Sequence, residues 1–173
     1  MDAGLTELFT VMPGNADVGR VLVKVAALNS IYATGILATT RMAHHIVDLG
    51  VDARLVGEQS DADLVEQIAR LDIDGTVRRN YSFATKYCSF HRPDLYPFYD
   101  SLVSGVSNTL LRQGDVFTVT RPASWGRDYD AWCQAVRDFR ECFGLTGFSL
   151  RQIDKYLWKL AKQRQADQWL NRE

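Results

Sequence analysis

Apolar residues recur every three or four positions along almost the whole of this 173-residue chain, and alternating strand patterns are scarce. Such a period places the apolar side chains on one face of an α-helix. In the segment VGRVLVKVAALNSIYAT, for example, Val21, Val25 and Leu28 share a face. The sequence therefore predicts a compact, all-α, multi-helix fold. Its length suits a single domain over residues 1–173.

Start and stop signals divide this pattern into separate helices. Ser60 or Asp61 is suited to cap a helix start, and Gly50 to end one. Pro93 and Pro97 interrupt a helix, because proline lacks the backbone donor. The segment 72–80 is predicted as a loop, and VFTVT (116–120) is the single strand-like run. The predicted helices cover residues 18–34, 36–50, 61–71, 81–91, 101–114, 128–144 and 149–170.

The charge of the chain is unevenly distributed, although its net value is only −1. Residues 1–76 contain five Lys and Arg against eleven Asp and Glu, whereas residues 77–173 contain fifteen against ten. A basic half is compatible with an anionic partner such as a nucleic-acid backbone. A solvated basic face accounts for the same asymmetry.

Several classes of protein are disfavoured by the sequence. No apolar run is long enough to cross a bilayer, and the acidic start MDAGLTELFTVMPGN lacks the features of a signal peptide. The odd number of cysteines, three, is typical of reduced thiols. We therefore expect a cytoplasmic protein without a membrane partner, and a monomer.

No metal site or cofactor is predicted. His44 and His45 are adjacent, so on a helix they point about 100° apart and do not share a site. The chain has no Cys-x-x-Cys pair and no glycine-rich loop of the kind that cradles phosphate.

The stretch NYSFATKYCSFHRPDLYPFYDSLV, residues 80–103, carries the main candidate for chemistry. A predicted helix with Ser82 and Lys86 ends at two proline breaks, and the carboxylate of Asp100 follows the second break. Pro97 stiffens the backbone before this acid, and aromatic neighbours can anchor it. Because aspartate is also a common N-cap, a purely structural role for Asp100 remains open.

This arrangement resembles the helix-hairpin-helix DNA glycosylase superfamily, the group of endonuclease III, adenine glycosylase and oxoguanine glycosylase. The segment Ser82-Phe83-Ala84 stands for the family's helix element, and Pro97–Asp100 for its acid segment. Their interval of 18 residues is similar to that of the endonuclease III and adenine-glycosylase branches. The resemblance covers about residues 61–106 and implies a helix-hairpin-helix-like element around residues 61–91.

The resemblance implies an enzyme that hydrolyses the N-glycosidic bond of a damaged or modified base in double-stranded DNA, in repair or in defence against phage DNA. Asp100 would be the key catalytic acid, because the sugar becomes positively charged as the bond breaks. Ser82 stands where lyase-type members carry a lysine, which indicates base removal without strand cleavage. Lys86, one turn further, is a candidate for a displaced nucleophile or simply a surface lysine.

Residues around this segment are candidates for binding the substrate. The family's hairpin uses several glycines to approach a phosphate, but the equivalent loop here has only Gly75. Basic and amide side chains would then contact the DNA backbone instead. For all of these candidates the alternative to substrate binding is a structural role, either packing in the core or exposure on a solvated loop. The base-binding candidates are Ser82, Asn29, Tyr32, Tyr81 and Tyr99, and the backbone-binding candidates are Arg78, Arg79, Asn80 and Arg92.

A second hypothesis comes from a different functional class. The chain would be a non-catalytic helical module that binds nucleic acid or a protein, with Asp100 acting as a helix cap. It would bind through Arg78, Arg79 and the basic C-terminal helix. The two hypotheses differ in geometry, because a catalytic Asp100 needs to face a cleft deep enough for one base, whereas a capping Asp100 bonds only the amides of residues 102 and 103 on a flat surface.

Overall fold

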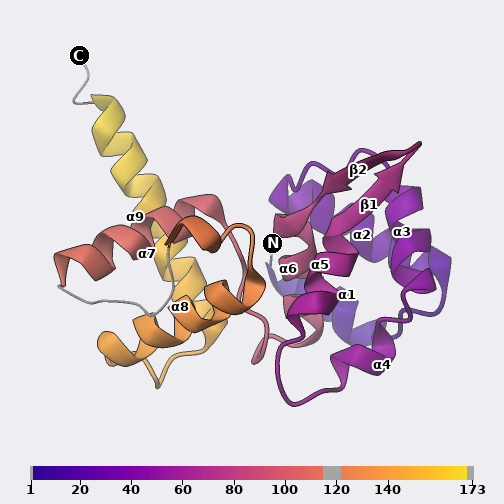
Figure 1. The fold of residues 1–173 in the computed structure, drawn as a ribbon, viewed down its shortest axis with the longest axis horizontal. Coiled ribbons are helices and arrows are strands. Elements are labelled where there is room, and N and C mark those ends of the chain that lie inside the picture. The colour runs from indigo at the N-terminus through magenta and orange to yellow at the C-terminus, as the bar shows by residue number, and fades with distance from the viewer. Residues whose placement is uncertain (1, 115–121, 171–173) are drawn as a thin grey trace. The chain divides into compact units, whose positions relative to one another are not determined.

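The computed structural model describes residues 2–114 and 122–170, and within these the chain is mostly helical (Figure 1). The prediction of an all-α fold is confirmed. The predicted strand-like run at 116–120 lies outside the described residues. The helices are α1 (Asp2–Val11), α2 (Val18–Tyr32), α3 (Thr39–Asp48), α4 (Asp52–Leu55), α5 (Ala62–Ala69), α6 (Tyr81–His91), α7 (Ser101–Gln113), α8 (Tyr129–Cys142) and α9 (Leu150–Leu170), with a 3-10 turn at Pro122–Ser124.

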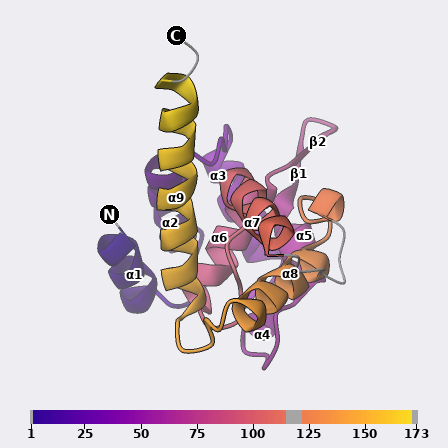
Figure 2. The ribbon, with the colours of Figure 1, turned by 90° about the vertical axis from the view of Figure 1, so that its left-hand side faces the viewer.

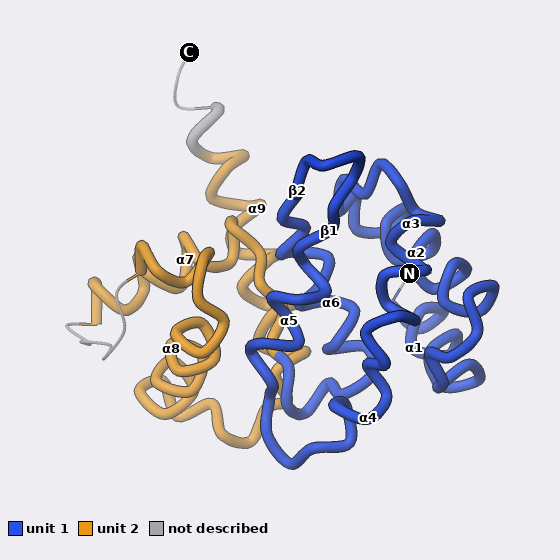
Figure 3. The backbone as a smooth tube through the Cα atoms, turned by 45° about the vertical axis from the view of Figure 1, so that its right-hand side comes forward, with its two compact units in different colours: residues 1–96 blue, residues 97–173 orange. Residues whose placement is uncertain are grey.

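The chain divides into two compact units, which Figure 3 distinguishes by colour. Unit 1 comprises residues 1–96 and unit 2 comprises residues 97–173. The organisation as a single domain stays a prediction.

The core of unit 1 forms where α2 packs on α3 and α5 packs on α6. The apolar stripe predicted on α2 is buried, with Val21, Val25 and Leu28 fully inaccessible. The helix α6 is buried along most of its length, from Tyr81 to Ser89. Helix α1, which the sequence pattern did not predict, adds the buried side chains of Leu5 and Phe9.

The segment between α5 and α6 is a β-hairpin, so the prediction of a loop at 72–80 was wrong. Strands β1 (Arg70–Ile73) and β2 (Thr76–Arg79) pair antiparallel. Both residues of the connecting turn, Asp74 and Gly75, have positive φ values of 53° and 81°. Asp-Gly is the typical pair for such a tight turn, because it tolerates the left-handed conformation that matches the strand twist. The side chain of Asp72 accepts a hydrogen bond from Gly75 N at 2.8 Å.

Unit 2 is built from α7, α8 and α9, and α7 packs against α9. Its core contains two indole rings, those of Trp125 and Trp132, with centroids 5.6 Å apart. Helix α9 begins with the predicted capping box, in which Gln152 N donates to Ser149 Oγ and Ser149 N donates to Gln152 Oε1. Its C-terminal part extends beyond α7 and α8 (Figure 2).

None of the helices in the described part of the chain combines the length and the apolar character needed to cross a membrane. Cys88 and Cys133 are buried and Cys142 is exposed, and all three are free thiols. Within residues 2–114 and 122–170, no three metal-ligating side chains cluster together.

Candidate functional site

Asp100 is the N-cap of α7 in unit 2. Its backbone is extended, and its Oδ1 accepts hydrogen bonds from Leu102 N at 2.8 Å and Val103 N at 3.4 Å. Its Oδ2 makes no hydrogen bond or ion pair with any residue that the structure describes. The capping role is therefore confirmed, and half of the carboxylate remains open for another partner.

The backbone that leads into Asp100 is anchored by two buried aromatic side chains of α8. The hydroxyl of Tyr129 donates to the carbonyl of Pro97 at 2.9 Å, and Trp132 Nε1 donates to the carbonyl of Phe98 at 2.9 Å. Both aromatic side chains are almost inaccessible, at 3% and 2% exposure. The prediction that aromatic neighbours anchor this segment in a core is confirmed for Phe98, which is buried, whereas Tyr99 is half-buried.

Tyr99 is half-buried and packs edge-on against Trp132, with ring centroids 5.5 Å apart. Gly126 lies directly beside it: a Cβ at this position would be 2.7 Å from the Tyr99 hydroxyl oxygen. A side chain at position 126 would therefore displace the ring. The role of Tyr99 in binding a base stays a prediction.

An apolar pocket lies nearby in unit 2, between α7, α8 and α9. Phe98, Val103, Trp132, Ile153 and Leu157 are among its lining residues, and Asp100 is not. This pocket therefore does not provide the cleft that a catalytic Asp100 would require.

Ser82 and Lys86 lie one turn apart on α6 in unit 1, and they contact each other. Lys86 Nζ donates to Ser82 Oγ at 2.6 Å and is within 3.4 Å of the Ser82 carbonyl oxygen. It also lies 5.7 Å from the ring centroid of Tyr32. Only 3% of Lys86 is exposed, so the alternative of a surface lysine was wrong. Lys86 is buried because α6 is surrounded on almost every side, and not along one face alone.

Asn29 and Tyr32 were predicted to read the edge of a base, and both engage unit 1 itself. Asn29 Oδ1 accepts from Thr34 Oγ1 and Ile36 N, each at 2.9 Å, and its Nδ2 donates to the Ile36 carbonyl at 3.1 Å. The Tyr32 hydroxyl donates to Asp2 Oδ1 at 2.5 Å. These contacts brace the loop after α2, and base recognition by either residue stays a prediction.

The predicted backbone-binding residues Arg78, Arg79 and Asn80 are on or beside the hairpin, and Arg92 follows α6. Most of the four have partners within unit 1. Arg79 forms a bidentate ion pair with Glu66, at 2.9 and 2.7 Å, and its guanidinium lies 4.2 Å from the ring centroid of Tyr81. Asn80 N donates to the Ala69 carbonyl at 2.7 Å. These contacts hold the end of the hairpin against α5 and the start of α6.

Arg92 and Arg78 have contrasting surroundings. Arg92 donates to the carbonyls of Leu55 and Gly57 at 2.8 and 2.9 Å. The guanidinium of Arg78 is exposed and makes no hydrogen bond or ion pair with any residue in the described ranges. Of the four backbone-binding candidates, Arg78 is therefore the one whose charge is open to a ligand without breaking an internal contact.

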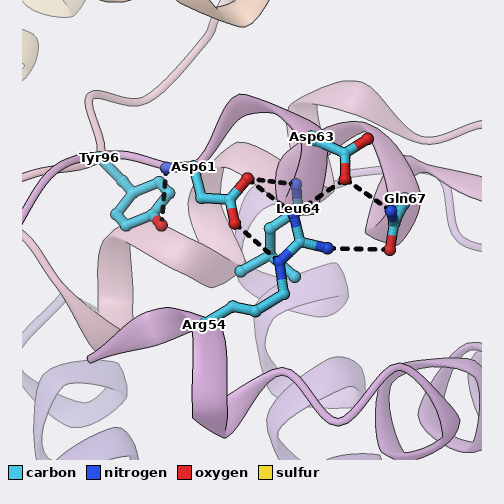
Figure 4. A network of polar contacts seen from close by, with 6 residues as sticks. All are labelled: Arg54, Asp61, Asp63, Leu64, Gln67 and Tyr96. Atoms are coloured by element: carbon cyan, nitrogen blue, oxygen red, sulfur yellow. Dashed lines mark hydrogen bonds and ion pairs between the residues drawn. The ribbon is translucent and has the colours of Figure 1, made fainter. Parts of the chain in front are cut away.

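A polar network at the start of α5 was not predicted (Figure 4). Arg54 binds both oxygens of Asp61 at 2.7 Å, and it also reaches Asp63 at 2.9 Å and Gln67 at 3.0 Å. Burial raises the pKa of Asp61, but the hydrogen bonds from Arg54 and from the amides at the start of α5, together with the charge of Arg54, lower the pKa overall. Asp61 N donates to the Tyr96 hydroxyl at 3.0 Å. The network orders the N-terminus of α5 and is structural.

A second unpredicted cluster surrounds Lys24, which is fully buried on α2. Its ammonium donates to the carbonyls of Met12 and Gly14 and to Asn15 Oδ1 at 2.5 Å, and it lies 3.5 Å from His91 Nε2. Burial lowers the pKa of Lys24 to about 8. A lysine within the apolar stripe of Val21, Val25 and Leu28 was the sequence signal for this cluster.

Asn15 is the centre of the Lys24 cluster. Its backbone N and Nδ2 donate to the two carboxylate oxygens of Asp52 at 2.8 and 2.6 Å, and its Oδ1 also accepts from the Tyr87 hydroxyl. The residue thereby joins α2, α4 and α6. Because Lys24 is fully inaccessible to solvent, we interpret the cluster as a structural element of the core.

His91 gives this core a predicted dependence on pH. Burial, and then the charge of Lys24, lower the pKa of His91 to about 3, against an opposing effect of Asp52. The unfolded chain takes up this proton near pH 6.5, whereas the folded chain does not. The neutral form of His91 therefore stabilises the folded state fully above pH 6.5, and this stabilisation is lost as the pH falls below that value.

We expect the free energy of unfolding to fall by about 2 kcal/mol between pH 7 and pH 5 through His91 alone. Urea denaturation at several pH values measures it. The His91→Gln variant, whose side chain does not titrate, should show a shallower dependence over the same range. If the free energy of unfolding depends on pH equally in the two proteins, His91 is not the source of this dependence.

Comparisons with known proteins place the chain in a family. The family model HI_0787_N, described as an N-terminal domain, matches residues 1–95, and the chain belongs to this family. A Haemophilus influenzae protein, described as uncharacterized, is 33% identical over 144 residues, which cover 83% of this chain and 67% of that protein. No solved structure matches the chain. The family match coincides with unit 1, and the similarity to the Haemophilus protein is longer than that unit.

Proposed function

We propose that this protein is a DNA glycosylase that hydrolyses the N-glycosidic bond of a damaged or modified base in double-stranded DNA. Asp100 is the acid at the centre of the proposal. The observation that carries it is the state of this carboxylate: Oδ1 is fixed by two amides, and no described residue bonds Oδ2. Tyr129 and Trp132 hold the preceding backbone in place.

A carboxylate held in this way suits the chemistry. The sugar develops positive charge as the base departs, and a fixed negative oxygen stabilises that charge without having to reorganise. The same oxygen can orient the attacking water. The target base has to leave the duplex stack before the bond is broken, as in other enzymes that act on bases.

The order of elements along the chain supports the same proposal. Helix α5, the hairpin and α6 follow the sequence order of the helix-hairpin-helix element, and Asp100 begins the next helix, 18 residues after Ser82. We assign the phosphate contact of the hairpin to Arg78, because its guanidinium needs no rearrangement to meet a ligand. Arg79 and Arg92 keep their internal partners.

We further propose that the enzyme acts without lyase activity. Lys86 is almost fully buried and donates to Ser82 Oγ, so its ammonium is held within the helix bundle of unit 1. An imine-forming lysine needs a deprotonated amine that reaches the sugar. Because Lys86 Nζ is engaged by Ser82 Oγ, we assign it a positioning role toward Ser82.

The test is an activity assay on duplex DNA that carries a panel of damaged bases and of bulky modified bases of the phage type. Alkali then cuts the DNA at any abasic site. We expect an alkali-labile product on one class of substrate, which also distinguishes repair from phage defence. Borohydride should trap no covalent adduct. No product across both classes would overturn the proposal, and an adduct would overturn the absence of lyase activity.

The capping role of Asp100 favours a second candidate, a non-catalytic module that binds nucleic acid or protein. In that case the two amide contacts account fully for the aspartate. The same panel separates the two candidates, because the module would bind DNA and release no base from it.

A further inference from the structure

Helix α9 of unit 2 has two different faces. Ile153, Leu157 and Ala161 form its buried face, and this helix packs on α7. On the opposite side, Lys155, Lys159 and Lys162 are all exposed. Residues four and seven positions apart lie on the same side of a helix, so these lysines form one row. The rise of a helix makes the row about 10 Å long.

Two aromatic side chains flank this row. Tyr156 is 64% exposed and Trp158 is 45% exposed, although side chains of this kind usually find a place in a core. Lys162 Nζ lies 5.5 Å from the ring centroid of Trp158. We call the five residues Lys155, Tyr156, Trp158, Lys159 and Lys162 the α9 lysine face.

Helix α9 itself contributes no negative charge to the α9 lysine face. Residues 155–166 contain no Asp or Glu. The acid immediately before them, Asp154, is only 18% exposed and lies 3.6 Å from Arg151 of the same helix. Every ionic side chain on the outer face of this stretch is therefore a cation, which makes the face complementary to an anionic ligand.

We propose that the α9 lysine face binds the phosphate backbone of a nucleic acid, with the exposed aromatic rings available to stack on unpaired bases. A row of about 10 Å spans about three successive phosphates of one strand. Lysines that neutralise phosphates release counterions, and aromatic rings beside such a row are typical of single-strand contacts.

The chemistry of the face favours nucleic acid over a membrane surface. A helix that lies in a bilayer interface buries a continuous apolar face in the lipid. The apolar face of α9 is already packed within unit 2, and two separate aromatic rings remain on the outer side. An anionic bilayer would therefore offer this helix charge attraction without apolar burial.

This inference deepens the proposed function, since it names a surface that would hold the DNA, but it is testable without catalysis. We would measure the affinity of the full-length protein for fluorescent 20-residue oligonucleotides without modified bases, single-stranded and duplex, at several salt concentrations. The test variant replaces Lys155, Lys159 and Lys162 with Gln. The matched control removes three exposed charges elsewhere, by Arg20→Gln, Arg41→Gln and Arg137→Gln.

We expect the lysine variant to bind at least tenfold more weakly than the wild type. The slope of its log binding constant against log salt concentration should be smaller in magnitude by about two to three, whereas the control keeps both values. The Trp158→Leu variant should lose about tenfold in affinity for the single strand and little for the duplex. Circular dichroism confirms that each variant is folded.

Equal affinity and salt slope in the lysine variant and the wild type would overturn this inference, as would an equal loss in the arginine control. Binding confined to anionic phospholipid vesicles would also overturn it. If the lysine variant loses binding while the wild type releases no base, the α9 lysine face stands and the glycosylase proposal fails. If the lysine variant keeps the affinity and salt slope of the wild type while both proteins release bases, the α9 lysine face fails and the glycosylase proposal stands.

Discussion

Replacing Asp100 with Asn should lower the rate of base release by a hundredfold or more and leave the fold unchanged. The loss follows because the amide carries no negative charge to stabilise the developing positive charge on the sugar; a term of this kind contributes about 10²–10³ in rate. The fold survives because asparagine is as good an N-cap as aspartate, so the amides of Leu102 and Val103 keep an acceptor. Single-turnover assays on the active substrate measure the rate.

The chain offers a matched control at the start of α8. Asp128 caps this helix through a hydrogen bond from Ala131 N at 3.1 Å, and its side chain is exposed. The Asp128→Asn variant makes the same chemical change in the same structural setting, and we expect it to keep full activity. Undiminished activity of the Asp100→Asn variant would show that Asp100 is a cap and nothing more.

Replacing Asn15 with Ala should destabilise the protein by about 3 kcal/mol or more. The change removes the Nδ2 hydrogen bond to Asp52, while the backbone N of residue 15 keeps its own, and it leaves Lys24 and Tyr87 without a shared acceptor in the core. Removing one partner of a buried charge costs about 3–5 kcal/mol, because the charge that remains is poorly solvated. Urea denaturation followed by circular dichroism gives the free energy of unfolding.

The contrasting variant is Lys24→Met, which removes the buried charge itself. Replacing a buried ion with an apolar side chain of similar volume is often close to neutral. Here it leaves the carbonyls of Met12 and Gly14 without the ammonium, so we expect a loss, but a smaller one than for Asn15→Ala. A larger loss for Lys24→Met than for Asn15→Ala would contradict the central role of Asn15.

The helices were predictable because their signals are local. The predicted helix at 81–91 coincides with α6, and the starts of α5 and α9 follow from Asp61 and Ser149, which bond amides three residues away. The hairpin was missed although Asp74-Gly75 is its signal, since four-residue strands are too short for an alternating pattern to stand out. The apolar period therefore located most of the helices and overlooked α1, α4 and the two four-residue strands.

The candidate site was predictable only in part. The cap formed by Asp100 and the contact between Ser82 and Lys86 depend on spacings of two to four residues, which the sequence displays. The anchoring of Pro97 and Phe98 by Tyr129 and Trp132 spans more than 30 residues. Nothing in the local pattern indicates which aromatic side chain meets which carbonyl.

The sequence by itself determined where most helices begin and end, because capping and amphipathic period act within a few residues. Only the tertiary structure decided the partners of the buried polar groups. Asn15 meets Asp52 across 37 positions and Tyr87 across 72. Such pairs depend on how helices pack, and packing brings together side chains that no short-range pattern connects. A lysine in an apolar stripe signals a buried partner, and the fold alone identifies it as Asn15.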